Sequence, residues 1–413
     1  MSEGLKMRTV LRLIGATLVG TVALTPTPLR GQSPAVPNQQ TAPGWIFTPS
    51  IAVGGTWDDN VLLVNPGPDP SSDYASPITP GVSLDYTGKL TRFSSGYSGS
   101  IIRYASLGDL NSFQQSLRAM IEHRATARLT FFGQEVFSAA PTTDVLQLSG
   151  VPFYRIGARS NAAGGGVQAA LAKHTTLRSM YTLRSVAFDL NTFTANQLQG
   201  GRAHDITANL DHALSAHLTL GGEYAFSHAV VNSSRFNGIE GPQDRFNIQT
   251  GSLTAQYQVA AGTMLAGGFG VARLGAGLTH EARTGPEWRA SITQRAGRGS
   301  VAASYRRAYI PSFGFGGTFQ NQQWSGNVHM PIGRTRAYVD GGIYWLNNEP
   351  LDTDQPRLRT AWFTSNVGSY ATRWLRLEGF YGRTQQDTRR AGGQLERNQL
   401  GFRIIAAKPL KLR

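Results

Sequence analysis

Hydrophobic and polar residues alternate along most of the chain with a period of two. In residues 218–228, Leu220 and Tyr224 lie on one face of an extended chain, and Thr219 and Glu223 lie on the other. The same alternation returns in two later segments, residues 336–345 and 375–381. This period is typical of β-strands that have one apolar and one polar face. The pattern therefore predicts an all-β chain.

The links between these strands alternate between short and long. Eight short turns are expected at Gly88–Thr91, Ala125–Ala127, Lys173–Thr175, Ser215–His217, Ala260–Gly262, Ala296–Arg298, Ile332–Arg334 and Tyr370–Thr372. Longer loops are expected between them, for example at Asn65–Ser76, Ala140–Arg155, Asn232–Gln243, Asn347–Arg357 and Thr388–Gly393. Eight turns pair sixteen strands, and one more strand at each end gives about 18, an even number as in bacterial outer-membrane barrels.

A sheet that crosses lipid must close on itself, because every backbone N–H and C=O group needs a partner within the protein. The apolar face of each strand would then meet lipid, and the mixed face would meet water in the lumen. A soluble β-sandwich or propeller is the alternative, but the chain shows neither stacked domains with linkers nor a blade repeat. The prediction is a transmembrane antiparallel β-barrel of about 18 strands, with short periplasmic turns and longer extracellular loops.

Composition agrees with a barrel. Charged residues make up 15% of the chain, against about 25% in an average soluble domain. No stretch after residue 24 approaches the roughly 18 apolar residues of a membrane helix. The absence of cysteine excludes disulfides, thiolate metal sites, cysteine nucleophiles and a lipoprotein anchor.

The amino terminus resembles an export signal. Lys6, Arg8 and Arg12 precede a short apolar segment, Leu13–Leu24, which is too short to span a bilayer. The expected organisation is a signal peptide at residues 1–33, a linker at 34–44 and the barrel at 45–413. A cytosolic protein with an apolar amino-terminal helix is the alternative. The net charge of +14 falls to about +11 once residues 1–33 are removed.

Arginine is the enriched residue that bears on function. An arginine facing the lipid midplane of a barrel costs about 2–4 kcal/mol, so the arginines that alternate with apolar residues should face inward. The expected lumen-lining residues are Arg178, Arg184, Glu223, Arg289, Arg295, Arg306, Arg336, Asp340, Arg376 and Glu378. Basic residues that line a pore favour anions. The other interpretation is that these arginines pair with Glu223, Asp340 and Glu378 and brace the wall.

Other motifs are weaker. Asp58-Asp59-Asn60 could offer oxygen ligands to calcium, but it fits a turn signal better. His204, His212, His217 and His228 are expected in loops or in the lumen and not around a metal. The Gly164-Gly165-Gly166 run is not followed by the lysine of a phosphate-binding loop and is expected to mark a bend or a close approach. No catalytic residue, metal or cofactor is assigned, and no nucleophile elbow is present.

The segment of residues 48–62, which contains Trp57 and Asp58-Asp59-Asn60-Val61, resembles the first strand of the beta-barrel porin 2 family. Thr79–Tyr86, Gly96–Gly99, Arg103-Tyr104, Leu110–Phe113 and Pro141–Asp144 resemble later parts of the same family. The resemblance covers about residues 45–145. It implies an outer-membrane barrel without enzymatic activity, often associated with exopolysaccharide systems.

The predicted function is a porin-like channel in the bacterial outer membrane, with a lumen that favours anions, or the barrel component of an exopolysaccharide export system. The alternatives are a non-conducting structural or adhesive barrel and a barrel enzyme. Expected partners are outer-membrane lipid and lipopolysaccharide, the barrel-assembly machinery, and polysaccharide or small anionic solutes. Nucleic acid is not expected.

Many such barrels end in Phe or Trp, but this chain ends in Lys411-Leu412-Arg413, so assembly signals are expected at Leu400, Phe402 and Ile404.

Overall fold

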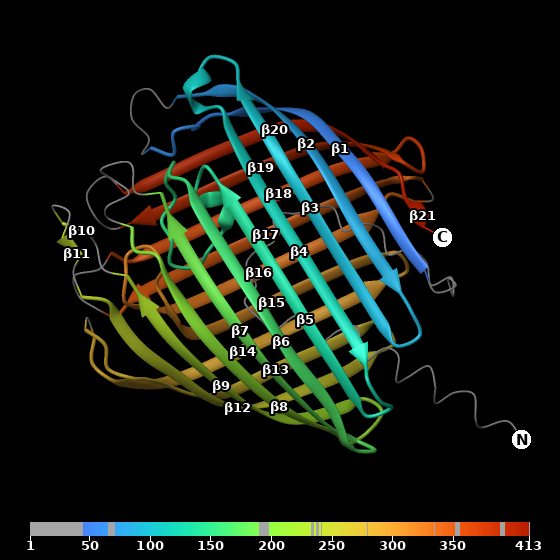
Figure 1. Ribbon diagram of the computed structural model, residues 1–413, viewed down its shortest axis with the longest axis vertical. Helices are drawn as coiled ribbons and strands as arrows, with labels where there is room; N and C mark the ends of the chain where they lie inside the picture. Colours follow the sequence, from blue (N-terminus) through green and yellow to red (C-terminus); the bar gives the residue numbers. More distant parts are fainter. Residues whose placement is uncertain are drawn as a thin grey trace, which may run out of the picture.

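The computed structural model describes residues 44–64, 71–189, 198–232, 235–236, 239–240, 242–278, 280–333, 335–351, 356–388 and 393–412. These residues form a closed antiparallel barrel of 18 long strands (Figure 1), which confirms the predicted fold class. The predicted signal peptide at 1–33 lies outside the described residues. The first strand begins at Gly44, next to the predicted barrel start at residue 45.

Each long strand has 12 to 17 residues. In chain order they are β1 (Gly44–Asp58), β2 (Asp73–Thr87), β3 (Thr91–Tyr104), β4 (Ser112–Arg124), β5 (Leu129–Ala140), β6 (Ala158–Ala172), β7 (Thr175–Phe188), β8 (Gly201–Ala213), β9 (Leu218–Val231), β12 (Asp244–Ala260), β13 (Thr263–Leu274), β14 (Arg283–Ala296), β15 (Gly299–Pro311), β16 (Thr318–Pro331), β17 (Ala337–Pro350), β18 (Leu358–Tyr370), β19 (Leu375–Thr388) and β20 (Gln394–Ala407). Short elements in the connections are η1 (Gly108–Leu110), η2 (Asp144–Leu146), β10 (Arg235–Phe236) and β11 (Ile239–Glu240).

The barrel closes where β1 meets β20. Val53 pairs with Ile404 and Trp57 with Leu400 in an antiparallel register. A last short strand, β21 (Leu410–Leu412), continues the pairing with the first residues of β1. Every long strand therefore has a neighbour on both sides, which leaves no open sheet edge, as a lipid environment requires.

All eight predicted short turns fall between paired strands and gather at one end of the barrel, the short-turn end. The longer connections gather at the opposite end, the long-loop end. The predicted loop 347–357 is shorter than expected, because β17 continues to Pro350. The predicted loop 65–76 is displaced towards the amino terminus, because β1 already ends at Asp58 and β2 begins at Asp73. Backbone pairing between strands extends into residues that the sequence assigns to loops, and the polar composition of these residues does not show this. Among the described residues, no helix is long and apolar enough to span a membrane.

The outer surface of the barrel is covered with exposed apolar side chains. Leu253, in the middle of β12, is 74% exposed, and Leu220 and Leu377 are also exposed. Their strand neighbours Glu223 and Arg376 point the other way and take part in ion pairs of the lumen. The face assignment predicted from alternation is therefore correct for these strands, and the exposed apolar band has the character of a lipid-facing wall.

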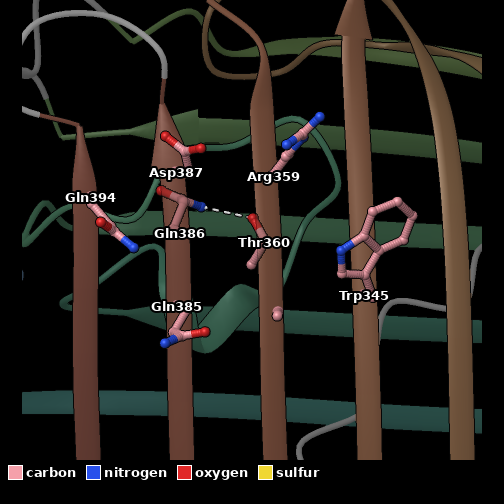
Figure 2. Close-up of a pocket in the computed structure, with 8 residues that line it drawn as sticks. Trp345, Arg359, Thr360, Gln385, Gln386, Asp387 and Gln394 are labelled. Carbon is pink, nitrogen blue, oxygen red and sulfur yellow. Dashed lines mark hydrogen bonds between the residues drawn. The ribbon is translucent and has the colours of Figure 1, made fainter.

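One shallow cavity of about 130 Å³ lies in the outer face at the long-loop end of β17–β20 (Figure 2). Trp345, Arg359, Gln385, Asp387 and Gln394 belong to the set of side chains that alternation puts on the outside of the wall. This cavity is separate from the lumen, because the sheet itself stands between the two.

Candidate functional site: the lumen and its constriction

The wall from β7 to β14 carries ion pairs on its concave inner face. Nε of Arg184 in β7 lies 2.5 Å from Oδ2 of Asp205 in β8, and Nη2 of Arg184 lies 3.0 Å from Oδ1. Nη1 of Arg289 in β14 lies 2.6 Å from Oε1 of Glu223 in β9, although β12 and β13 stand between these strands. A concave face brings the side chains of separated strands together, so these groups belong to the lumen.

Arg306 in β15 is the most exposed arginine in these lumen pairs. Its Nη2 lies 3.8 Å from Oε1 of Glu287 in β14, which makes the ion pair loose. The side chain of Arg306 is 46% exposed, whereas that of Glu287 is 5% exposed. The guanidinium therefore faces the water of the lumen, and the carboxylate lies beneath it.

A second cluster lies on the inner face of β17, β19 and β20. Glu378 accepts hydrogen bonds from Arg403 and from the hydroxyl of Tyr338, and Nε of Arg376 lies 3.0 Å from its Oε1. The Glu378 side chain is 1% exposed, against 16% for Arg376 and 29% for Arg403. One buried carboxylate is thus covered by two arginines.

The same relation holds in all five arginine–carboxylate pairs of these two lumen clusters: the arginine is more exposed than its partner. Pairing balances much of the formal charge, as the bracing interpretation predicts. Within these five pairs, the more accessible group is the guanidinium and not the carboxylate.

Arg178 in β7 is held differently. Its guanidinium carbon lies 4.1 Å from the centre of the Phe132 ring in β5, a distance suited to a cation–π contact. Gly166 in β6 leaves room for that ring, because a Cβ at this position would be 2.6 Å from Cζ of Phe132. The predicted close approach in the glycine run thus occurs at Gly164 and at Gly166. At Gly166 it positions Arg178, which makes no ion pair with any described carboxylate.

The other predicted lumen residues occupy different places. Asp340 in β17 faces inward, with Oδ1 2.6 Å from Nδ1 of His329. Arg295 lies next to the last residue of β14, exposed at the short-turn end. Arg336 lies in the turn before β17 and is exposed there, outside the barrel wall. Arg336 is therefore removed from the lumen set, since alternation has no meaning outside a strand.

At the long-loop end, residues 141–157 fold into the barrel instead of away from it. Val151, Phe153 and Ile156 are almost fully buried, although the segment is a loop. Val151 and Ile156 belong to an apolar cluster with side chains of β6–β9, β12 and β13. Burial also raises the pKa of the Tyr154 phenol. We call residues 141–157 the constriction loop.

The constriction loop reaches the far part of the wall. The backbone N–H of Phe153 donates to Oε1 of Gln386 in β19 at 2.7 Å. The Phe153 side chain packs against Leu63, which follows β1, and Leu395 in β20. Five strands lie between β5 and β19, so the loop narrows the lumen by crossing it.

The loop between β15 and β16 meets the constriction loop inside the barrel. Phe313 joins the apolar cluster around Val151. The Ser312 hydroxyl donates to the carbonyl of Gly150 at 3.4 Å. Gln199, before β8, forms a β-bridge with Gly314. Three connections thus support one another at the long-loop end.

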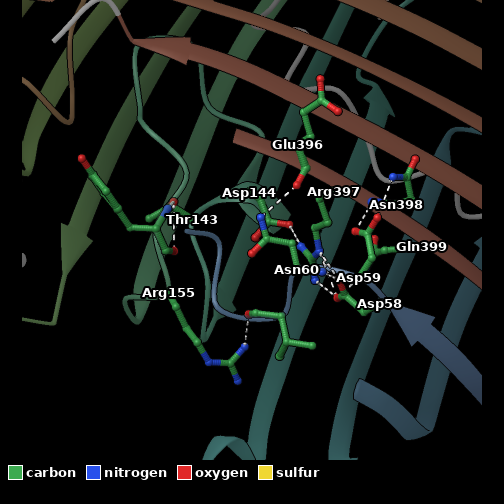
Figure 3. A network of polar contacts seen from close by, with 12 residues as sticks. Asp58, Asp59, Asn60, Thr143, Asp144, Arg155, Glu396, Arg397, Asn398 and Gln399 are labelled. Atoms are coloured by element: carbon green, nitrogen blue, oxygen red, sulfur yellow. Dashed lines mark hydrogen bonds and ion pairs between the residues drawn. The ribbon is translucent and has the colours of Figure 1, made fainter. Parts of the chain in front are cut away.

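A buried ionic network fixes one side of the constriction loop (Figure 3). Nε of Arg397 in β20 lies 3.0 Å from both carboxylate oxygens of Asp58 at the end of β1. Nη1 of the same guanidinium binds Asp144 in the constriction loop. Arg155 donates from Nη1 to the carbonyl of Val61 at 3.0 Å. We call the contacts of Arg397 with Asp58 and Asp144 the latch.

The Asp58-Asp59-Asn60 motif therefore has a structural role. Asp59 accepts hydrogen bonds from Asn398, and the Asn60 side chain binds the carbonyls of Val64 and Glu396. These contacts tie the end of β1 to β20 and form the turn that the sequence predicts. Among the described residues, no three His, Asp or Glu side chains gather in a way that could hold a metal ion.

Three of the four histidines in question lie outside the lumen. Nδ1 of His204 is 2.8 Å from the hydroxyl of Tyr181, and Nδ1 of His228 is 2.7 Å from Oδ1 of Asn247, both on the outer face. His212 shares the face of His204, and His217 lies in a turn as expected. The expected lumen positions are wrong for His204, His212 and His228, because these residues alternate with the inward Asp205 and Glu223.

Comparisons with known proteins add little beyond the fold. No family model and no curated protein matches the chain, so the resemblance to beta-barrel porin 2 proteins stays a prediction. Among solved structures, OpdO of Pseudomonas aeruginosa is 12% identical, with 90% of this chain and 98% of that chain covered and a TM-score of 0.45. OccAB2 of Acinetobacter baumannii is 10% identical over 89% and 98%, with a TM-score of 0.46. The siderophore receptor PirA of Pseudomonas aeruginosa is 10% identical over 88% and 80%, with a TM-score of 0.43. At this level of similarity, function has to be argued from the residues of the chain itself.

Proposed function

We propose that the protein is a porin-like channel of the bacterial outer membrane whose lumen favours small anionic solutes. The observation that carries this proposal is the unequal exposure of the lumen ion pairs. In each of the five pairs of the two lumen clusters the guanidinium is the more exposed partner, as Arg306 over Glu287 illustrates. A solute that passes along this wall meets arginine donors, which bind carboxylate and phosphate groups in a forked geometry.

The long-range part of this preference is limited by salt. Charges in water act over a Debye length of about 8 Å at physiological ionic strength. Several lumen carboxylates, among them Asp205 and Glu287, offset the arginines next to them. We therefore expect a moderate anion preference that is strongest at low salt.

The outer-membrane location is supported by the apolar outer band and by closure of the sheet. We propose that the barrel-assembly machinery recognises β20, where Leu400, Phe402 and Ile404 form an exposed apolar row. The tail after β20 does not hang free of this region, because Leu410–Leu412 pairs with β1. An association with exopolysaccharide export rests on the sequence resemblance alone and would require the constriction loop to move.

A second candidate is a barrel that conducts nothing. It is favoured by the packing of the three connections at the long-loop end, where Val151 and Phe319 are fully or almost fully buried. If the remaining passage is closed to ions, the protein would serve as a structural or adhesive barrel.

A planar-bilayer recording separates the two candidates. The channel hypothesis predicts discrete conductance steps and, under a KCl gradient, a reversal potential that shows chloride to be the more permeant ion. Replacing Arg178 and Arg306 by Gln should lower the chloride preference. Arg159→Gln is the matched control, because Arg159 is an exposed arginine on the outer face of β6.

Cation preference in the parent protein, or a chloride preference that the lumen variants leave unchanged, would contradict the anion proposal. A correctly folded barrel without conductance would support the closed structural barrel instead.

A further inference from the structure

The outer face of the barrel carries a belt of arginines at the long-loop end. Alternation and exposure put eight of them on the outside of the wall, close to the loops: Arg103, Arg159, Arg202, Arg245, Arg273, Arg307, Arg359 and Arg383. Below the belt the same face is apolar, for example at Leu400 and Phe402. In an outer-membrane barrel, this height corresponds to the headgroups of the outer leaflet.

The cavity of Figure 2 lies within this belt. Arg359, the second residue of β18, lines it from above, and the exposed ring of Trp345 in β17 lines it from the side. Gln385, Asp387 and Gln394 supply amide and carboxylate groups from β19 and β20. An aromatic ring beside amides and a carboxylate can accept the apolar face of a sugar ring and bind its hydroxyls.

The guanidinium of Arg359 has N–H donors without an acceptor among the described residues. Its Nε is buried and has no partner among the described residues. Asp387 is its direct neighbour across the strands, yet the two side chains form no ion pair, and Figure 2 shows the guanidinium turned away from Asp387. Nη1 and Nη2 of Arg359 also make no hydrogen bond or ion pair with any described residue, and unlike Nε they are not buried, so they are the donors that a phosphate oxygen can reach.

The neighbouring charges are already engaged. Arg357 donates to Glu349 at 2.6 Å, and Arg383 lies 3.6 Å from Glu396. Arg359 is therefore the arginine around this cavity that is left to bind an external anion.

We propose that the cavity of Trp345, Arg359, Gln385, Asp387 and Gln394 binds a phosphorylated sugar headgroup of an outer-leaflet glycolipid. Arg359 receives the phosphate, and Trp345 packs against the sugar ring. The other arginines of the belt supply weaker attraction around the rest of the barrel. This inference rests on the proposed outer-membrane location but not on conduction through the lumen.

The test uses the purified full-length barrel in phospholipid nanodiscs, titrated with lipid A and, separately, with lipid A stripped of its phosphates. Binding is measured by native mass spectrometry and by a fluorescence titration. We expect phosphorylated lipid A to bind and the stripped form to bind at least about tenfold more weakly, which is the loss of one charged hydrogen-bonded contact. Inorganic phosphate serves as the competitor that separates a free anion from a headgroup.

Arg359→Gln should weaken lipid A binding by about tenfold, and Trp345→Leu should weaken it to a smaller extent. Arg202→Gln is the matched control, since Arg202 belongs to the belt but lies on β8, far from the cavity. Equal binding by Arg359→Gln and the parent, or full displacement of lipid A by millimolar inorganic phosphate, overturns the proposal.

The shift in electrophoretic migration on heating shows whether the variants fold as barrels, and bilayer conductance separates the two proposals. A barrel that conducts but does not distinguish the two forms of lipid A refutes the headgroup site and leaves the channel intact. A barrel that binds lipid A through Arg359 but does not conduct supports the headgroup site and refutes the channel.

Discussion

The backbone N–H of Phe153 and Oε1 of Gln386 lie 2.7 Å apart, although 233 residues and five strands separate them. This hydrogen bond joins the constriction loop to the inner face of β19. Together with the latch it determines how far the loop extends across the lumen.

The latch predicts a release variant. Arg397→Ala leaves the buried Asp58 and Asp144 without their cation, a change that typically costs about 3–5 kcal/mol. We expect the constriction loop to detach and the single-channel conductance to rise, or conductance to appear if the parent is closed. Limited proteolysis should then cut within residues 141–157.

The control for the latch is Arg383→Ala. Arg383 also pairs with a carboxylate of β20, Glu396, but on the exposed outer face, where such pairs contribute about 0–1 kcal/mol. Equal behaviour of Arg397→Ala and the parent in both assays would mean that the latch does not hold the loop.

The face assignment predicts opposite outcomes for neighbouring positions. Leu253→Arg places a cation on the lipid face near the middle of β12 and should destabilise the barrel by about 2–4 kcal/mol. Thr254→Arg points into the lumen, near Asp211, and should cost much less. Urea unfolding in lipid vesicles measures both, and comparable losses would refute the membrane orientation.

The glycine run provides a packing test. Gly166→Ala introduces a Cβ 2.2 Å from the backbone oxygen of Ser179 and 2.6 Å from the Phe132 ring. Overpacking of this kind costs about 1–3 kcal/mol, and the displaced ring should also shift Arg178. Gly165→Ala is the control, because the nearest atom to its added Cβ is 3.5 Å away. Thermal unfolding of the two variants should differ clearly; if both unfold alike, Gly166 is not a point of close approach.

The orientation of the barrel is open to chemical labelling, because the chain has no cysteine of its own. A cysteine at Asp109, in the loop after β3, should react with an impermeant maleimide on intact cells. A cysteine at His174, in the turn between β6 and β7, should react only after the outer membrane is opened. The reverse pattern would show that the short turns face outward.

Much of the wall follows from the sequence, because alternation is a local property of each strand. The eight short turns, the closure at 18 strands and the facing of Leu220, Glu223 and Arg376 are all readable in this way. Alternation does not apply at Arg336, which lies in a turn. At His204 alternation gives the correct outer face, and the polarity of the side chain is what wrongly suggests the lumen.

The constriction could not be read from the sequence, because it depends on contacts between distant segments. Val151, Phe153 and Ile156 are an apolar group within a long loop, and they are the one local signal that this loop turns inward. Arg397 carries no local signal at all: its partners Asp58 and Asp144 are 339 and 253 residues away. The sequence marks Asp58-Asp59-Asn60 as a turn motif, but it does not show that the motif binds β20.

The latch also has a consequence for the order of assembly. Arg397 lies on the last long strand and binds both the first strand, through Asp58, and the constriction loop, through Asp144. The loop therefore lacks its anchor until β20 has arrived and the seam with β1 has formed. During biogenesis the apolar contacts of the loop with β6–β9, β12 and β13 can form earlier, but its ionic anchor is added only when the final strand seals the wall.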